Sequence, residues 1–221
     1  MTKQAILFGS IGTLVETSEL QRQAFNQAFK EAGLDWSWDP DEYRKLLKSS
    51  GGEQRIKDYA DTKGKDVDAT ALHRRKTAIF DKAMISDGLS LRDGVSDVVK
   101  RAKDNGIKLA FVTTTSRDNV DAIFMALGDS LGRDDFEFVG DASVTTAGKP
   151  HPDIYTAALD ALGVDATACV AIEDTGVSAK SPLAAGIETV GFAGEYADRD
   201  DYDAAVRVVD ALEYADLTGP N

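Results

Sequence analysis

The clearest structural signal in this chain is the stretch Ala5-Ile6-Leu7-Phe8-Gly9-Ser10-Ile11-Gly12-Thr13-Leu14-Val15-Glu16. Residues 5–8 are apolar and lack helical spacing, which predicts a short buried strand. The two glycines within residues 9–13 then break the run and predict a tight loop. A loop at the carboxyl end of a strand directs backbone N–H groups toward whatever binds at that edge of the sheet. We therefore expect a ligand site at residues 9–13.

The next part of the chain is predicted to be helical throughout. Apolar residues recur at helical spacing within residues 18–32, and Gly33 ends that helix. Glycine-containing turns separate three further predicted helices, at residues 41–48, 54–62 and 69–85. No strand is predicted between residues 15 and 88.

From Gly94 onward, helices alternate with short apolar strands. The predicted helices are 95–104, 117–127, 153–162 and 178–185, and the predicted strands are 108–113, 136–139, 169–172, 189–192 and 206–209. Such alternation predicts an α/β fold with a doubly wound, mostly parallel sheet. The core would comprise residues 1–15 and 89–221, with residues 16–88 inserted as a helical cap. Residues 217–221 are predicted to be a frayed tail.

Composition narrows the class of protein. The 221 residues carry a formal net charge of −13, which disfavours nonspecific binding to nucleic acid. The sequence contains no apolar run long enough to span a membrane, and residues 1–4 lack the apolar stretch of a signal peptide. We expect a globular cytoplasmic protein without membrane contact, and the sequence does not identify a protein partner. Cys169 lies in an apolar run, which predicts a buried small hydrophobic residue.

Residues 8–17, Phe-Gly-Ser-Ile-Gly-Thr-Leu-Val-Glu-Thr, resemble the first motif of haloacid dehalogenase-like phosphatases, Phe-Asp-x-Asp-Gly-Thr-Leu-x-x-Thr. In that family the first aspartate attacks the phosphoryl group and binds Mg²⁺, and the second acts as general acid and base. Gly9 and Ile11 stand at those two positions here. The resemblance therefore implies the family's Rossmannoid scaffold without its catalytic pair.

The resemblance extends over essentially the whole chain and is strongest to the subgroup of CbbY-type sugar-phosphate phosphatases and β-phosphoglucomutases. That subgroup carries a helical cap directly after the first motif. The matching segments are residues 19–26, 34–36, 51–56 and 113–116. Two positions depart from the subgroup's pattern: Gln21 replaces a histidine, and Glu53 replaces a lysine of the cap turn.

The second motif of the family is a hydroxyl residue that closes a strand, supplied here by Thr113 with Thr114 beside it. A hydroxyl and a backbone N–H at this edge hold a phosphoryl oxygen in fixed geometry. The backbone from Ser10 to Gly12 adds further N–H groups. The alternative is that Thr113 only caps the following helix.

The third motif is a lysine, here Lys149 in Ala147-Gly-Lys-Pro-His-Pro-Asp153. Pro150 and Pro152 restrict the backbone around it, which suits an ammonium group aimed at an anion. Lys149 is thus a predicted phosphate ligand. We expect His151 to pack in the loop rather than to act in catalysis.

The fourth motif contains Glu173 and Asp174, at the end of a predicted strand, where the family uses carboxylates to hold Mg²⁺. A magnesium site needs few protein ligands, but they must be well placed. Without a carboxylate at position 9, we expect weak or no Mg²⁺ binding by Asp174 and Glu173. The alternative is that both acids only cap the following turn.

Arg55 is the candidate substrate residue of the cap, because relatives use this turn to reach the distal part of the substrate. The arginine fork matches a second phosphate or sugar hydroxyl groups. The alternative is that Arg55 pairs with a nearby acid such as Glu53 or Asp58.

Two functions remain open. Glycine has no side chain to act as a nucleophile and isoleucine moves no proton, so the first hypothesis is a catalytically silent homologue that keeps a phosphate pocket and still binds a phosphorylated small molecule or a protein partner. The second is an active Mg²⁺-dependent phosphomonoesterase with a non-standard nucleophile, for which Ser10 and Asp174 are the candidates. Continued strand alternation would point the Ser10 side chain away from the site, which disfavours the second hypothesis.

Overall fold

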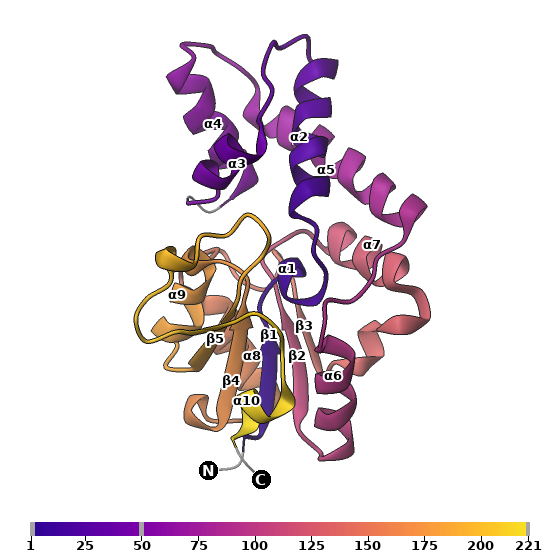
Figure 1. The fold of residues 1–221 in the computed structure, drawn as a ribbon, viewed down its shortest axis with the longest axis vertical. Coiled ribbons are helices and arrows are strands. Elements are labelled where there is room, and N and C mark those ends of the chain that lie inside the picture. The colour runs from indigo at the N-terminus through magenta and orange to yellow at the C-terminus, as the bar shows by residue number, and fades with distance from the viewer. Residues whose placement is uncertain (1–2, 49–50, 220–221) are drawn as a thin grey trace.

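The computed structural model describes residues 3–48 and 51–219, and six of its strands form one parallel sheet (Figure 1). The strands are β1 (Ala5–Phe8), β2 (Lys108–Val112), β3 (Phe138–Gly140), β4 (Cys169–Glu173), β5 (Glu188–Phe192) and β6 (Arg207–Val209). Their order in the sheet is β3-β2-β1-β4-β5-β6, with every neighbouring pair parallel. The predicted α/β class with a doubly wound sheet is confirmed.

Side chains alternate along β1 and divide the core into two layers. Ile6 and Phe8 belong to the larger layer, which includes residues of α6 (Val95–Asp104), α7 (Arg117–Leu127) and α10 (Tyr214–Thr218). Ala5 and Leu7 belong to the second layer, against α8 (Asp153–Leu162), with α9 (Gly176–Ala184) beside α8. Both faces of the sheet are therefore covered, and β1 is buried along its whole length.

The register of the central strands sets the position of the motifs. Phe8 lies opposite Phe111 on one side and Ile172 on the other. The three strands therefore end together, and the Gly9 N–H donates a hydrogen bond of 2.9 Å to the Ile172 carbonyl. The residues that follow β1, β2 and β4 therefore meet at the carboxyl edge of the sheet, where ligands bind in open α/β sheets.

Four helices lie above this edge: α2 (Ser18–Glu31), α3 (Pro40–Leu46), α4 (Gly52–Thr62) and α5 (Ala69–Asp87) (Figure 1). Their shared core is aromatic and consists mainly of Phe25, Phe29, Trp36, Trp38, Tyr43 and Tyr59. The C-terminal half of α5 packs into the larger layer of the sheet core through Phe80 and Met84. These helices lie within residues 16–88, the predicted cap, and the boundary of the cap stays a prediction.

Some local predictions differ from the structure. Residues 11–14 form a short helical turn, α1 (Ile11–Leu14), where a loop was expected. The frayed tail predicted for residues 217–221 is wrong at Leu217, which lies in α10 and is 1% exposed in the sheet core. Burial of this leucine stabilises the end of the chain. Pro220 and Asn221 lie outside the described residues.

None of the helices in residues 3–48 and 51–219 combines the length and the apolar composition that a membrane span requires.

Candidate functional site

A cavity of about 340 Å³ lies between the cap and the carboxyl edge of the sheet. Its core-side wall includes Ser10, Ile11, Gly12, Thr113, Thr114, Thr115, Asn119 and Asp174. Its cap-side wall includes Gln21, Phe25, Tyr43, Arg55, His73, Lys76 and Thr77. The structure thus brings together six of the predicted site residues: Ser10, Gly12, Thr113, Thr114, Asp174 and Arg55. Lys149 and Glu173 are not among the described residues that line the cavity.

Position 9 has no space for a side chain in this arrangement. A Cβ atom placed on Gly9 would lie 2.3 Å from the Glu173 Cδ atom and 2.3 Å from the Tyr155 hydroxyl oxygen. Both distances are far below van der Waals contact. The Glu173 carboxylate and the Tyr155 hydroxyl therefore occupy the space that a side chain at position 9 would need.

Lys149 pairs with Glu173 beneath the cavity. The Lys149 Nζ atom donates to the Glu173 Oε1 atom at 2.6 Å, to the Val112 carbonyl at 2.8 Å and to the Gly9 carbonyl. These three acceptors use all three donors of an ammonium group. The side chains are 6% exposed for Lys149 and 0% for Glu173, so the ion pair is buried.

Tyr155 completes this cluster. Its hydroxyl donates a hydrogen bond of 2.7 Å to the same Glu173 Oε1 atom, and burial raises the Tyr155 pKa well above its usual value. The tyrosine therefore stays protonated and keeps its donor role. For Lys149 to bind phosphate as predicted, its ammonium would have to give up at least one of its three present acceptors. Its role as a phosphate ligand stays a prediction.

Asp174 is the one carboxylate among the described residues that line the cavity. The pKa of Asp174 is raised to about 6, mainly by burial and secondly by the negative charge of Glu173. The Ser10 hydroxyl lies close enough to lower this pKa in part, although Ser10 Oγ forms no well-aligned hydrogen bond within the described residues. A Cβ atom on Gly12 would lie 1.9 Å from Asp174 Oδ2, so glycine at position 12 gives this carboxylate its room.

The expectation that the Ser10 side chain points away from the site is wrong. Ser10 lines the cavity and influences Asp174. The physical reason is that β1 ends at Phe8, so the alternation of side chains along the strand does not extend to position 10.

The described residues do not supply the carboxylates that a magnesium ion prefers. Within residues 3–48 and 51–219, no three aspartate, glutamate, histidine or cysteine side chains gather as a metal site. Glu173 is directed at Lys149 and Tyr155, which leaves Asp174 as the carboxylate at the cavity. The donor set therefore does not fit Mg²⁺. Weak or absent metal binding stays a prediction for solution.

Arg55 lies in the cap-side wall and is largely buried, at 7% exposure. Its Nε atom donates to the Leu46 carbonyl at 2.9 Å, and its guanidinium group lies 5.7 Å from the centre of the Tyr43 ring. Burial lowers the Arg55 pKa. Of the acids proposed as alternative partners, Glu53 forms an ion pair with Lys57 at 2.6 Å. The substrate role of Arg55 stays a prediction.

Several residues of the cap-side wall were not predicted from the sequence, and Gln21, His73 and Lys76 are the polar ones that bear on binding. His73 and Lys76 are three positions apart in α5, a spacing that places two side chains on the same face of a helix. That spacing in the predicted helix could have identified both. Gln21 is part of the wall, and its Oε1 atom accepts a hydrogen bond of 3.0 Å from the Lys76 Nζ atom.

Arg92 holds the first-motif loop in place and was also missed. Its guanidinium group donates to the Gly12 carbonyl at 2.5 Å, to the Phe192 carbonyl at 2.9 Å and to the Ala193 carbonyl at 2.7 Å. It thereby ties the loop after β1 to the end of β5. No sequence motif around position 92 indicated this role.

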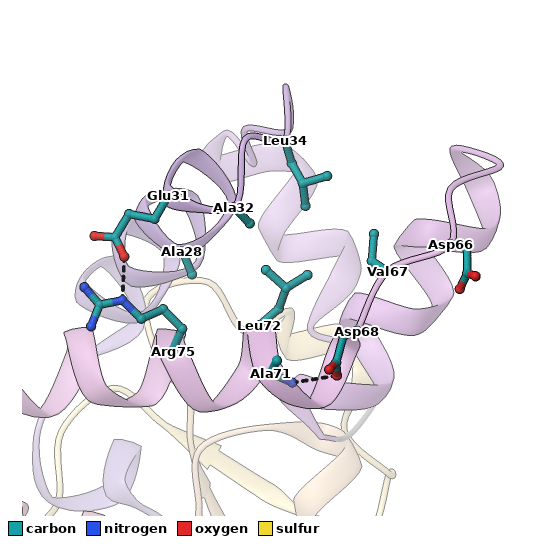
Figure 2. Close-up of a pocket in the computed structure, with 10 residues that line it drawn as sticks. All are labelled: Ala28, Glu31, Ala32, Leu34, Asp66, Val67, Asp68, Ala71, Leu72 and Arg75. Atoms are coloured by element: carbon teal, nitrogen blue, oxygen red, sulfur yellow. Dashed lines mark hydrogen bonds and ion pairs between the residues drawn. The ribbon is translucent and has the colours of Figure 1, made fainter.

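A larger cavity, of about 570 Å³, lies within the cap between α2 and the start of α5 (Figure 2). Its lining is mostly small and apolar, with Ala28, Ala32, Leu34, Val67 and Leu72, and an ion pair between Glu31 and Arg75 closes one end. None of the predicted site residues lines this cavity. We therefore assign the candidate site to the smaller cavity at the sheet edge.

Replacing Asp174 by asparagine is expected to stabilise the protein at pH 7. Because its pKa is raised to about 6, the folded state binds the proton more tightly than the unfolded state. The ionised carboxylate therefore costs stability, and this cost grows as the pH rises from about 4 to about 6. Allowing for its partial exposure, we expect a gain of about 1–2 kcal/mol at pH 7 and almost none at pH 4.

Urea unfolding at both pH values measures this effect. Asp66→Asn, an exchange at an exposed loop position, is the matched control and should change stability little at either pH. A loss of stability in Asp174→Asn at pH 7 would contradict the prediction and would indicate that the charged form is the stabilising one.

Comparison with known proteins places this chain near one family. The sequence profile of "Hydrolase: haloacid dehalogenase-like hydrolase" matches residues 3–186. Protein CbbY of Rhodobacter capsulatus is 38% identical over 208 residues, which cover 93% of this chain and 92% of that protein.

Solved structures agree with this comparison. The crystal structure of CbbY from Rhodobacter sphaeroides in complex with phosphate has a TM-score of 0.86 and 37% identity, covering 95% of this chain and 94% of the other. A variant of the same protein was solved in complex with xylulose-1,5-bisphosphate, with the same TM-score, identity and coverage. Both similarities extend over the cap as well as the sheet.

Proposed function

Because the chain belongs to the haloacid dehalogenase-like hydrolases, we propose that it binds a phosphorylated small molecule between cap and sheet without hydrolysing it. The proposal places the protein in the cytoplasm and does not require Mg²⁺. The family and the CbbY neighbours support the ligand class. The absence of hydrolysis is proposed from the residues of this chain.

One observation supports the proposed lack of hydrolysis. Position 9 is a glycine, and other side chains already fill the space that a side chain there would need. Covalent phosphoryl transfer needs a nucleophile with a lone pair at this point, and Gly9 provides none. Ile11, at the position of the family's acid and base, lines the cavity with an apolar side chain. Removal of residues that act together in catalysis costs about 10⁴ to 10⁶ in turnover in a dissected protease. We expect a loss of similar size here.

The ligand class follows from the two walls of the cavity. The core-side wall offers the hydroxyl groups of Thr113, Thr114 and Thr115, and the cap-side wall offers Arg55 and Lys76. A molecule with a phosphate at one end and a second anion or hydroxyl groups at the other would find donors at both ends. The CbbY structures in complex with phosphate and with xylulose-1,5-bisphosphate support a sugar phosphate.

We expect no Mg²⁺-dependent release of phosphate from sugar phosphates or from an aryl phosphate. The reason is the missing nucleophile at Gly9. A turnover screen of the purified protein with Mg²⁺ measures this against a buffer control. Phosphate release that scales with protein concentration across independent preparations would overturn the proposed silence.

A phosphate ion is expected to stabilise the protein, because the family's nucleophilic carboxylate is absent and no longer repels a dianion. Thermal unfolding in a phosphate series should show a rising midpoint. Thr113→Val removes one hydroxyl donor of the core-side wall at similar volume and should reduce the shift. Stabilisation that is absent, or equal in the variant, would count against an anion site at the sheet edge.

One observation favours the alternative, an active phosphomonoesterase with another nucleophile. Ser10 belongs to the cavity wall, and its buried hydroxyl, which has no hydrogen-bond partner among the described residues, lies beside Asp174, whose pKa of about 6 suits a general base near neutral pH. Should the turnover screen detect activity, Ser10→Ala tests this candidate directly. Loss of turnover in Ser10→Ala would support a serine nucleophile, and unchanged turnover would exclude it.

A further inference from the structure

Lys76 is a buried lysine at the edge of the candidate site. It belongs to α5, is 5% exposed and lines the cavity between cap and sheet. Its Nζ atom lies 4.8 Å from the centre of the Phe25 ring and 4.7 Å from the centre of the Phe80 ring. Its hydrogen-bond partner within the described residues is the neutral amide of Gln21, at 3.0 Å.

This environment is unusual for an ammonium group. Among the described residues, Lys76 Nζ forms no ion pair with a carboxylate: its hydrogen bond goes to Gln21, and Asp81 acts on it only through its charge. The charged groups that face it are Arg55 from α4, with His73 and Asp81 from its own helix. Burial and the Arg55 charge outweigh the Asp81 charge and lower the Lys76 pKa to about 7. At neutral pH a large share of this amine therefore carries a free lone pair.

We propose that Lys76 is a nucleophilic amine that forms an imine with an aldehyde or ketone carrying a phosphate group. The amine nitrogen attacks the carbonyl carbon and forms a C–N bond. The two amine protons leave with the carbonyl oxygen as one molecule of water, so no oxidant or reductant is needed. The imine is reversible and would hold a carbonyl ligand covalently in the cavity.

The geometry favours a phosphorylated carbonyl compound over a plain one. Lys76 lies in the cap-side wall, whereas the hydroxyl groups of Thr113, Thr114 and Thr115 lie in the core-side wall. A ligand whose phosphate binds the core-side wall would carry its carbonyl group toward the cap. This part of the inference rests on the proposed function. The reactivity of the amine itself does not, because it follows from the surroundings of Lys76.

The experiment uses the full chain with pyridoxal 5′-phosphate as the probe. Borohydride reduces any imine to a stable secondary amine, and peptide mapping by mass spectrometry gives the occupancy at each lysine. An exposed lysine amine is almost fully protonated at pH 7, so we expect occupancy at Lys76 to exceed that at the exposed Lys82 of the same helix about ten-fold. Labelling of Lys76 should rise through about pH 7.

Three variants serve as controls. Lys76→Arg keeps the positive charge and should abolish this label, whereas Lys82→Arg should leave it unchanged. His73→Gln should leave the pH profile of labelling unchanged, which separates titration of Lys76 from that of its neighbour. Because the occupancies are read in the parent protein, the test remains decisive even where a variant folds poorly.

The outcomes separate this inference from the proposed function. Selective labelling by pyridoxal as well as by its phosphate, with no competition by inorganic phosphate, supports the reactive amine but opposes the phosphate pocket. Stabilisation by phosphate with no preference for Lys76 over Lys82 overturns the inference and leaves the phosphate pocket standing. Selective labelling by pyridoxal 5′-phosphate that inorganic phosphate suppresses supports both.

Discussion

Replacing Lys149 by methionine is expected to lower the free energy of unfolding by about 3–5 kcal/mol. Methionine fills a similar volume but leaves the Glu173 carboxylate buried at 0% exposure without its counter-charge. The Tyr155 hydroxyl, at 2.7 Å, is then the remaining donor to that carboxylate among the contacts described above. Urea unfolding followed by circular dichroism measures the loss.

The double variant Lys149→Met, Glu173→Gln removes both charges and is expected to recover most of the lost stability. Replacement of a whole buried ion pair by uncharged groups is often nearly neutral, because the desolvation cost disappears together with the attraction. Lys57→Met is the matched control, since its pair with Glu53 has the same 2.6 Å separation but is exposed. It should cost less than about 1 kcal/mol. If Lys149→Met proves as stable as Lys57→Met, the idea that Lys149 and Glu173 form a buried pair whose charges compensate each other is contradicted.

Much of the fold was predictable because its signals are local. Helices at 95–104, 117–127 and 153–162 were predicted with the bounds that the structure has. Their apolar periodicity and flanking turn residues depend only on neighbouring sequence. The predicted bounds of strand β3 were wrong by up to two residues, because a strand of three residues at the edge of a sheet has little hydrophobic pattern. Leu217 was misjudged because burial against a distant core leaves no local signal.

The candidate site was predictable only in part. The sheet register brings Gly12, Thr113 and Asp174 to one edge, and the alternation of strands and helices was sufficient to expect that. The direction of the long side chains was not predictable. The Glu173 carboxylate occupies the space that a side chain at position 9 would need and pairs with Lys149, and this arrangement depends on three residues far apart in sequence.

The missing side chain at position 9 also determines which substitutions would be needed to restore phosphatase activity. We expect the double replacement Gly9→Asp, Ile11→Asp to create Mg²⁺-dependent phosphatase activity, with turnover about 10⁴-fold or more above the parent protein. It would supply the nucleophile, the general acid and base, and a metal-binding carboxylate together. Either single replacement should do far less, because residues that act as a unit contribute non-additively.

The new side chain at position 9 must displace both Glu173 and the Tyr155 hydroxyl, because the Glu173 Cδ atom and the Tyr155 oxygen each lie 2.3 Å from the required Cβ position. Neither is a backbone atom, so we expect the carboxylate of Gly9→Asp to take the place beside Lys149 once Glu173 turns toward the cavity and the Tyr155 ring shifts. Gly9→Ala, Ile11→Ala is the matched control: it displaces Glu173 equally but brings no carboxylate, so it should lose stability and gain no turnover. Turnover is measured with sugar phosphates and an aryl phosphate, with and without Mg²⁺. If the folded aspartate variant stays inactive on all of them, the cap and loops have diverged beyond the first motif, and the chain is better regarded as a binding protein than as a phosphatase that lacks two residues.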